Sequence, residues 1–221
     1  YENIWPAHSG WPLHLNDVYL TPITVAVDFE HNGNKTMVAV VAGRKSLTVV
    51  DESGTPINSS WPIMWAEDFT GVASLAIGNL DNDPDPEIVL YRGNFSFIPK
   101  AANIYVYKFD GTTLPGFGPK AIPIKNGTRA ELVVSDLNGD QKDEIILGGT
   151  YTEGSLNDPG ASVDNSYIFV VNPDGSMADG WPKYFTRKGA LYSLAIADLD
   201  EDWQKEVILG NYSSQAFNYK G

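Results

Sequence analysis

The 221-residue sequence contains no cysteine. A disulfide framework and a thiolate metal site are therefore excluded. The chain also has no run of about 18 apolar residues, which a membrane-spanning helix requires, so we expect no membrane span. Basic residues are scarce as well, with 15 Lys and Arg against 28 Asp and Glu and a formal net charge of −13. Because phosphate binding needs a basic surface, this balance argues against nucleic acid as a partner.

Glycine and proline, by contrast, are frequent, with 21 and 14 residues, and the apolar runs are short. This composition predicts an all-β protein with many turns. At 43% hydrophobic residues the chain can bury a substantial core. It starts at Tyr1 without a signal-like segment, so we expect a processed or trimmed N-terminus.

An acidic nine-residue segment occurs four times, each time before a run of aliphatic and β-branched residues. The four segments hold more than half of the Asp and Glu residues. Oxygen side chains at segment positions 1, 3, 5 and 9, with a backbone carbonyl at position 7, suit a hard cation such as Ca²⁺. The alternative is an acidic turn without a metal, although crowded carboxylates repel one another unless a cation neutralises them. The segments are residues 28–36, 79–87, 136–144 and 198–206.

A second motif keeps step with the acidic segments. An aromatic residue followed by proline, directly or after one glycine, precedes each of them by about 18 residues, and a glycine turn signal precedes the last three aromatic motifs. We predict that the aromatic residues pack between repeats. The aromatic motifs are Trp11-Pro12, Trp61-Pro62, Phe117-Gly118-Pro119 and Trp181-Pro182, and the turn glycines are Gly54, Gly111 and Gly175.

Each repeat is predicted to hold four strands. The first strand leads into the acidic segment, the second is the apolar run after it, the third ends at the glycine turn, and a short fourth carries the aromatic-proline motif. The second strand is almost continuously apolar, which predicts burial on both faces. Four-stranded units repeating at this length predict the antiparallel blades of a β-propeller. We therefore treat residues 1–221 as a single propeller domain or propeller segment.

The Asp-x-Asn-Gly-Asp segment with a terminal acid resembles the FG-GAP/VCBS repeat, which builds integrin α-like β-propellers. The resemblance covers nearly the whole chain and implies about three Ca²⁺ sites, with a fourth in doubt. The implied side-chain ligands are Asn79, Asp81, Asp83 and Glu87; Asp136, Asn138, Asp140 and Glu144; and Asp198, Asp200, Asp202 and Glu206. The implied backbone ligands are the carbonyls of Asp85, Lys142 and Gln204.

The chain departs from the family pattern at two points. The usual glycine at position 6 is replaced by Pro84, Gln141 and Trp203 in the three good segments. The first segment keeps its glycine but has Thr36 at position 9, so it lacks a carboxylate. We expect that segment to be weak or empty, and its weak candidate ligands are Asp28, Glu30 and Asn32.

Function is expected where the repeats differ. Residues 92–102 and 151–165 lengthen the same connection in the second and third repeats, and binding residues concentrate on such loops. The candidate ligand contacts are Arg92, Phe95, Phe97 and Tyr151. None of the three histidines, at positions 8, 14 and 31, recurs in the repeats, although His31 lies within the first acidic segment, and no catalytic residue is assigned.

Five Asn-x-Ser/Thr sequons favour an extracellular or cell-surface glycoprotein. They are at Asn34, Asn58, Asn94, Asn126 and Asn211. Millimolar calcium outside cells also suits loops of moderate affinity.

Three functions stay open. The first is a secreted, calcium-binding, non-catalytic module for adhesion, with an extracellular protein or carbohydrate as its ligand. The second is a polysaccharide lyase-type enzyme, since some lyases resemble this fold. The third is a structural repeat segment of an extracellular filament or coat. Four repeats are few for this family, so we expect self-assembly or further blades from another segment rather than a closed four-bladed ring.

Overall fold

The computed structural model describes residues 23–31, 34–42, 45–66, 73–81, 83–93, 102–122, 127–153, 163–185, 191–211 and 216–220. Within these ranges the regular structure is entirely β-strand, and the strands form four antiparallel sheets. The prediction of an all-β protein is therefore confirmed. The described part of the chain contains no helix long and apolar enough to cross a membrane.

Each sheet is a simple meander in which strands adjacent in sequence are hydrogen-bonded neighbours. Sheet 1 consists of β1 (Ile23–His31), β2 (Asn34–Ala42), β3 (Ser46–Val50) and β4 (Ile63–Met64). Sheet 2 consists of β5 (Ala73–Gly78), β6 (Glu87–Arg92), β7 (Ala102–Tyr107) and β8 (Lys120–Ile122). Sheet 3 consists of β9 (Gly127–Ser135), β10 (Glu144–Glu153), β11 (Val163–Val171) and β12 (Lys183–Phe185). Sheet 4 consists of β13 (Leu191–Ala197), β14 (Glu206–Asn211) and β15 (Ala216–Lys220).

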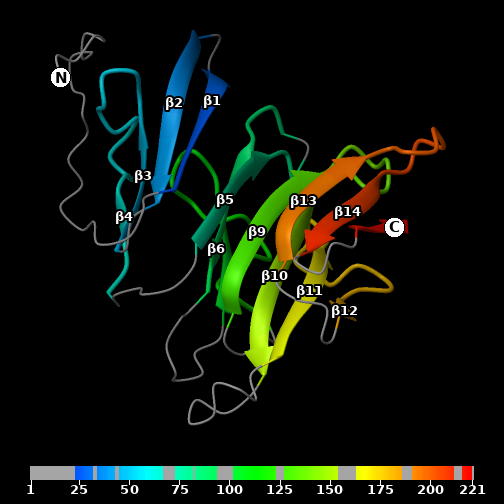
Figure 1. The fold of residues 1–221 in the computed structure, drawn as a ribbon. Helices are drawn as coiled ribbons and strands as arrows, with labels where there is room; N and C mark the ends of the chain where they lie inside the picture. Colours follow the sequence, from blue (N-terminus) through cyan, green and yellow to red (C-terminus); the bar gives the residue numbers. More distant parts are fainter. Residues whose placement is uncertain are drawn as a thin grey trace, which may run out of the picture.

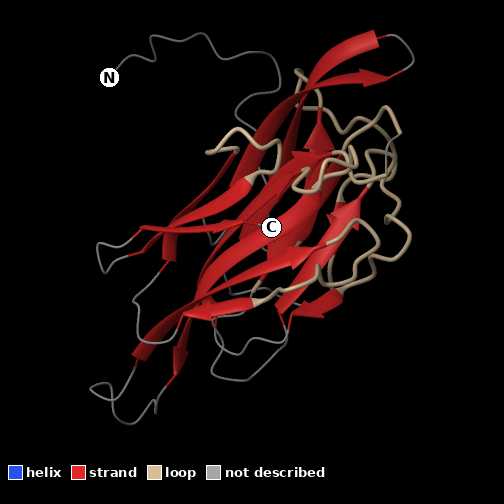
Figure 2. Cartoon of the chain, turned by 90° about the vertical axis from the view of Figure 1, so that its right-hand side faces the viewer, coloured by secondary structure: helices blue, strands red, loops and turns tan. Residues whose placement is uncertain are grey.

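The first strands of the four sheets lie beside one another in chain order. β1 contacts β5, β5 contacts β9, and β9 contacts β13. Figure 1 shows β1 and β13 at opposite ends of this row. In each four-stranded sheet the first-to-second and third-to-fourth connections lie at the same end of the strands, where most of the described loops gather (Figure 2). The acidic segments after β5, β9 and β13 therefore lie at one end of the molecule.

The core is built between successive sheets. β6 is buried on both faces, as its apolar sequence predicts. Because side chains alternate along a strand, Ile88 and Leu90 join the core between sheets 1 and 2, whereas Val89 and Tyr91 join the core between sheets 2 and 3. A third core forms between sheets 3 and 4 around Ile146 of β10.

The aromatic-proline motifs pack into these cores, as predicted. Trp61 is buried against sheet 2, and its indole Nε1 donates a hydrogen bond of 2.8 Å to the carbonyl oxygen of Phe109. Phe117 is buried between sheets 2 and 3, and Trp181 packs against the core between sheets 3 and 4. The fourth strands begin just after the motifs rather than containing them. Trp11 lies outside the described residues.

The predicted glycine turns also form. Gly54, Gly111 and Gly175 have φ angles of 76°, 91° and 81°, in the left-handed region that favours glycine. In each turn the glycine N–H donates to the carbonyl oxygen three residues earlier: Asp51 at 2.9 Å, Lys108 at 2.9 Å and Asn172 at 2.8 Å.

The first acidic segment differs from the expected loop. Residues 28–31 belong to β1 and residues 34–36 to β2, and the strands pair as far as His31 with Asn34. In the other three sheets the pairing stops at the residue before the segment, as in Gly78 with Glu87. Thr36 at position 9 has no carboxylate, and the sequence Asn32-Gly33 favours a tight two-residue hairpin connection. The open nine-residue loop expected at 28–36 is therefore replaced by a hairpin, with Asp28 and Glu30 inside β1 and Asn32 outside the described residues.

Candidate metal centres in three acidic loops

The three remaining acidic loops share a buried glutamate at position 9. Glu87, Glu144 and Glu206 open the second strand of their sheets and are at most 2% exposed. In each loop the Oε2 atom accepts a hydrogen bond from the backbone N–H of the second loop residue: Leu80 at 2.7 Å, Leu137 at 2.8 Å and Leu199 at 2.7 Å. This bond closes the loop and leaves the second carboxylate oxygen of the glutamate facing its interior.

The carboxylate at position 5 stabilises a turn in the second half of each loop. It accepts a hydrogen bond from the backbone N–H two residues later, a local turn typical of Asp. The pairs are Asp83 with Asp85 at 2.9 Å, Asp140 with Lys142 at 2.9 Å, and Asp202 with Gln204 at 3.0 Å. Positions 5 and 9 thus have the same roles in all three loops.

Position 6 has a left-handed backbone in two of the loops although glycine is absent there. Gln141 and Trp203 have φ angles of 70° and 71°, which glycine adopts most easily. Their N–H groups donate to the position-1 carboxylates, to Asp136 Oδ2 at 3.0 Å and to Asp198 Oδ2 at 2.9 Å. The second loop has Pro84 at this place, which has no N–H to donate. The second loop therefore lacks the hydrogen bond from the position-6 N–H to the position-1 side chain.

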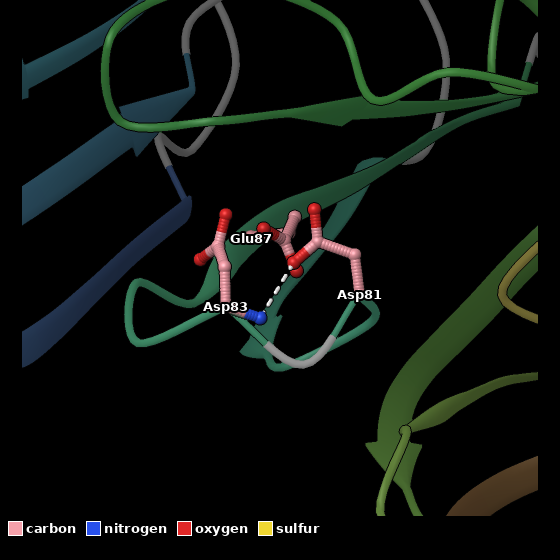
Figure 3. Close-up of side chains that lie close together, drawn as sticks. All are labelled: Asp81, Asp83 and Glu87. Carbon is pink, nitrogen blue, oxygen red and sulfur yellow. Dashed lines mark hydrogen bonds between the residues drawn. The ribbon is translucent and has the colours of Figure 1, made fainter.

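Two of the loops bring three carboxylates close enough to share a cation. The groups are Asp81, Asp83 and Glu87 in the second loop (Figure 3), and Asp198, Asp200 and Glu206 in the fourth. In each group, one oxygen per residue can be chosen so that all three lie within 4.8 Å of one another. The residues predicted as metal ligands at positions 1, 3, 5 and 9 thus include both groups.

Each of these groups contains a glutamate with a buried oxygen that has no hydrogen-bond partner among the described atoms. Glu87 Oε1 and Glu206 Oε1 are inaccessible to solvent, and neither has a hydrogen-bond partner among the described atoms. A buried, unpaired carboxylate oxygen is costly, and a bound cation would remove that cost. The residues present therefore fit a divalent metal ion.

The electrostatics of the second loop agree with this. Burial raises the pKa of Glu87 to about 7; the hydrogen bond from Leu80 opposes this rise, and the nearby carboxylates of Asp81 and Asp83 add to it. Burial likewise raises the pKa of Glu144. Added positive charge in these loops would favour the ionised forms of both groups.

The second loop already contains a positive charge. Lys108 Nζ lies 2.5 Å from Asp81 Oδ2, 2.6 Å from Asp83 Oδ2 and 3.8 Å from Glu87 Oε1. Its hydrogen bonds to the two aspartates raise the pKa of Lys108 and lower that of Asp83. The sequence reasoning missed this lysine because it belongs to the turn after β7, more than 20 residues beyond the loop.

The third loop is closed by an amide instead of a third carboxylate. Asn138 Nδ2 donates to Glu144 Oε1 at 3.0 Å, and Asn138 Oδ1 accepts from the N–H of Asp140 at 2.9 Å. Asp136 Oδ1 accepts from the N–H of Gly139 at 2.6 Å. The predicted ligands Asp136, Asn138, Asp140 and Glu144 therefore lie in one loop, with Asn138 satisfying the oxygen that is unpaired in the other two.

Neighbouring loops are tied to each other through position 8, which the sequence reasoning did not single out. Asn79 N–H donates to Asp143 Oδ2 at 2.9 Å, and Asp143 N–H donates to the carbonyl oxygen of Asn79 at 2.7 Å. Lys205 Nζ donates to Ser135 Oγ at 3.0 Å in the next pair of sheets. The loops thus form a connected row at one end of the molecule.

The candidate ligand contacts are more buried than expected. Arg92 ends β6, is 7% exposed, and stacks its guanidinium carbon 3.9 Å from the ring centroid of Trp65. Tyr151 lies within β10 and packs against Tyr167 and Tyr184, with ring centroids 6.2 and 6.4 Å away. Arg92 thus lies at the end of a strand rather than on an exposed loop, and the expected insertion at 151–165 partly continues β10 and β11. Phe95 and Phe97 lie outside the described residues.

Of the five sequon asparagines, Asn58 is the one whose contacts are described. Its Nδ2 donates to the carbonyl oxygen of Phe109 at 3.0 Å, and its Oδ1 accepts from the N–H of Ser60 at 2.8 Å. Asn58 therefore helps to hold the turn of sheet 1 against sheet 2. Asn34 begins β2 and Asn211 ends β14, whereas Asn94 and Asn126 lie outside the described residues.

No protein-family model matches the chain, and a search of curated proteins found no match. What the chain does is therefore inferred from the geometry of its loops and sheets.

Proposed function

We propose that this chain is a calcium-stabilised segment of a β-propeller that serves as a non-catalytic binding module outside cells. The observation that carries the proposal is the buried Oε1 of Glu206, which has no hydrogen-bond partner among the described atoms and belongs to a carboxylate grouped with those of Asp198 and Asp200. Oxygen-only donors of this kind favour a hard divalent cation. Calcium is the abundant one outside cells, and it tolerates the irregular geometry of such loops.

The arrangement of the sheets supports the propeller part of the proposal. Four meandering sheets follow one another with their first strands adjacent, and each apolar core lies between two successive sheets. Blades of a propeller are arranged in this way around an axis. The resemblance of the acidic loops to the FG-GAP/VCBS repeat points in the same direction.

Binding of an extracellular protein or carbohydrate is the activity we assign to this scaffold. Metal in the loops would stabilise the blades by binding only the native state. Recognition is then left to the connections in which repeats differ, between β6 and β7 and between β10 and β11. A self-associated form, or further blades from another segment, would complete the ring.

A calcium titration tests the metal site in the fourth loop. We expect Asp200→Asn to remove one bound calcium ion in isothermal titration calorimetry, because it replaces a carboxylate of the Glu206 group by an amide. Glu201→Gln is the matched control, since it removes the same charge from the same loop at an exposed residue outside that group. Equal losses in both variants would contradict a defined site.

Removal of the metal tests the stabilising role. EDTA should lower the melting temperature by several degrees, about 2–4 °C for each kcal/mol lost at this chain length, and added calcium should restore it. An unchanged melting temperature would contradict calcium stabilisation. A calcium-dependent rise in absorbance on a panel of polyuronides would contradict the non-catalytic assignment and favour a lyase.

A further inference from the structure

Lys108 holds the position in the second loop that a metal ion would take. Its ammonium group contacts both aspartates of the carboxylate group and approaches the buried glutamate. Asp81 and Asp83 are themselves oriented by the loop, because the N–H of Asp83 donates to Asp81 Oδ1 at 3.0 Å (Figure 3). The ammonium is thus centred among carboxylates that the backbone has already placed.

The ammonium group of Lys108 leaves one carboxylate oxygen of the second loop without a hydrogen bond. Glu87 Oε1 is fully buried and has no hydrogen-bond partner, and its 3.8 Å separation from Lys108 Nζ is too long for a hydrogen bond. A calcium ion binds its oxygen ligands at distances of 2.3–2.6 Å. Glu87 therefore presents an oxygen that lysine leaves unsatisfied and that a metal ion would bind.

The position of Lys108 in the repeat explains how it reaches the loop. It directly follows Tyr107 of β7, which pairs with Ile88, the residue after Glu87. In sheet 3 the equivalent residue is Asn172, which follows Val171, the partner of Ile145. The two turns have the same backbone bonds, from Lys108 N–H to Thr112 at 2.8 Å and from Asn172 N–H to Ser176 at 2.9 Å.

The side chains at this position differ in charge. Asn172 is neutral, and its Nδ2 donates to Ser176 Oγ at 2.9 Å within its own turn. Lys108 instead extends to the acidic loop of its sheet. The same backbone position therefore adds a positive charge to the second loop and none to the third.

We propose that Lys108 supplies an internal ammonium in place of a metal ion in the second acidic loop, whereas Asn172, at the same position of sheet 3, adds no charge to the third loop. This inference rests on the proposed calcium function of the loops. It reduces the number of metal sites expected from the acidic pattern, because the ammonium group of Lys108 already offsets negative charge in the second loop. Two positive charges cannot share so small a space without strong repulsion.

Substitution of Lys108 tests the proposal. Lys108→Asn should add one calcium ion per chain, counted by native mass spectrometry and calorimetry. Lys108→Arg keeps the charge and should leave the calcium count of the wild type unchanged.

The outcomes separate this inference from the calcium proposal. An unchanged calcium count in Lys108→Asn, with calcium still bound by the wild type, would overturn the role of Lys108 and leave the calcium function standing. Calcium absent from the wild type and gained in Lys108→Asn would support the role of Lys108 and contradict resident calcium. No calcium in any of the proteins would overturn both.

The fourth loop needs a separate test. The register pairs Glu206 with Lys220, whose side chain is not among those described. Asp200→Asn reports on that loop separately. Circular dichroism of each variant, with and without calcium, checks that a change in calcium count does not come from unfolding.

Discussion

Three described loop residues with a β-carbon have a left-handed backbone, which their side chains disfavour: Gln141, Glu201 and Trp203, with φ angles of 70°, 61° and 71°. Gln141 and Trp203 are left-handed at φ near 70°, which costs roughly 1–2 kcal/mol for a residue with a β-carbon. Their N–H groups gain hydrogen bonds to Asp136 and Asp198 in return. Trp203 is 90% exposed, so burial of its ring does not offset the cost. The loop shape is thus imposed by the hydrogen bonds of the position-1 carboxylates.

Gln141→Gly should therefore stabilise the protein. Relief of the left-handed strain outweighs the added freedom of the unfolded chain, for a net gain of about 0.5–1 kcal/mol. Urea unfolding of calcium-free protein measures it. Gln204→Gly is the matched control, because Gln204 is exposed, lies in an equivalent loop and does not have a positive φ. The free energy of unfolding of this variant should fall by about 0.5–1 kcal/mol. A loss in both variants would show that no strain is stored at Gln141.

At the scale of elements, the close approach of sheets 2 and 3 depends on a glycine. A β-carbon at Gly78, the last residue of β5, would overlap Asp143 Oδ2 and Val134 Cγ2 of sheet 3. Asp143 is the residue that exchanges two hydrogen bonds with Asn79, at the start of the second loop. The absence of a side chain at position 78 therefore permits the contact that joins the two loops.

Gly78→Ala should destabilise the protein by about 1–3 kcal/mol, as expected when a methyl group is forced into a packed contact. Thermal and urea unfolding would both detect it. Gly118→Ala serves as the control, because a β-carbon there meets no atom within 4 Å. If the two variants lost the same stability, close packing at Gly78 would not be the cause.

At the scale of the whole molecule, no described sheet packs on one face of sheet 4, at the end of the row. Ile146 of β10 is fully buried by sheet 4, whereas Ile208, at the same repeat position in β14, is only half-buried. Ala195 in the neighbouring strand β13 is exposed. In sheet 2 the equivalent face, which includes Val89, is covered by sheet 3.

Ile146→Ala should accordingly cost about 2–5 kcal/mol, the usual range for a buried isoleucine, and Ile208→Ala should cost much less. Urea unfolding at low protein concentration compares the two. Equal losses would mean that Ile208 is as buried in solution as Ile146, as it would be if a further sheet covered it. Sedimentation equilibrium of the wild-type protein would show whether a second copy does so.

Local sequence determined most of the elements. Alternating and continuous apolar runs placed the strands, glycines placed the turns, and the position-9 glutamates marked the three loops that form. The first segment could have been identified as a hairpin as well, since Asn32-Gly33 is a strong two-residue connection signal. Each of these features depends on residues within about ten positions of one another, so periodicity and turn chemistry suffice to find them.

The tertiary structure decided what each loop contains and how the loops are joined. Lys108 enters the second loop from the turn after another strand, Asp143 bonds to a loop in the preceding sheet, and Arg92 is buried under Trp65 of sheet 1. These contacts join residues separated by about 25 to 65 positions in the chain. Spacing along the sequence carries no signal for them, because side-chain charge and burial are set by which strands and sheets become neighbours after folding.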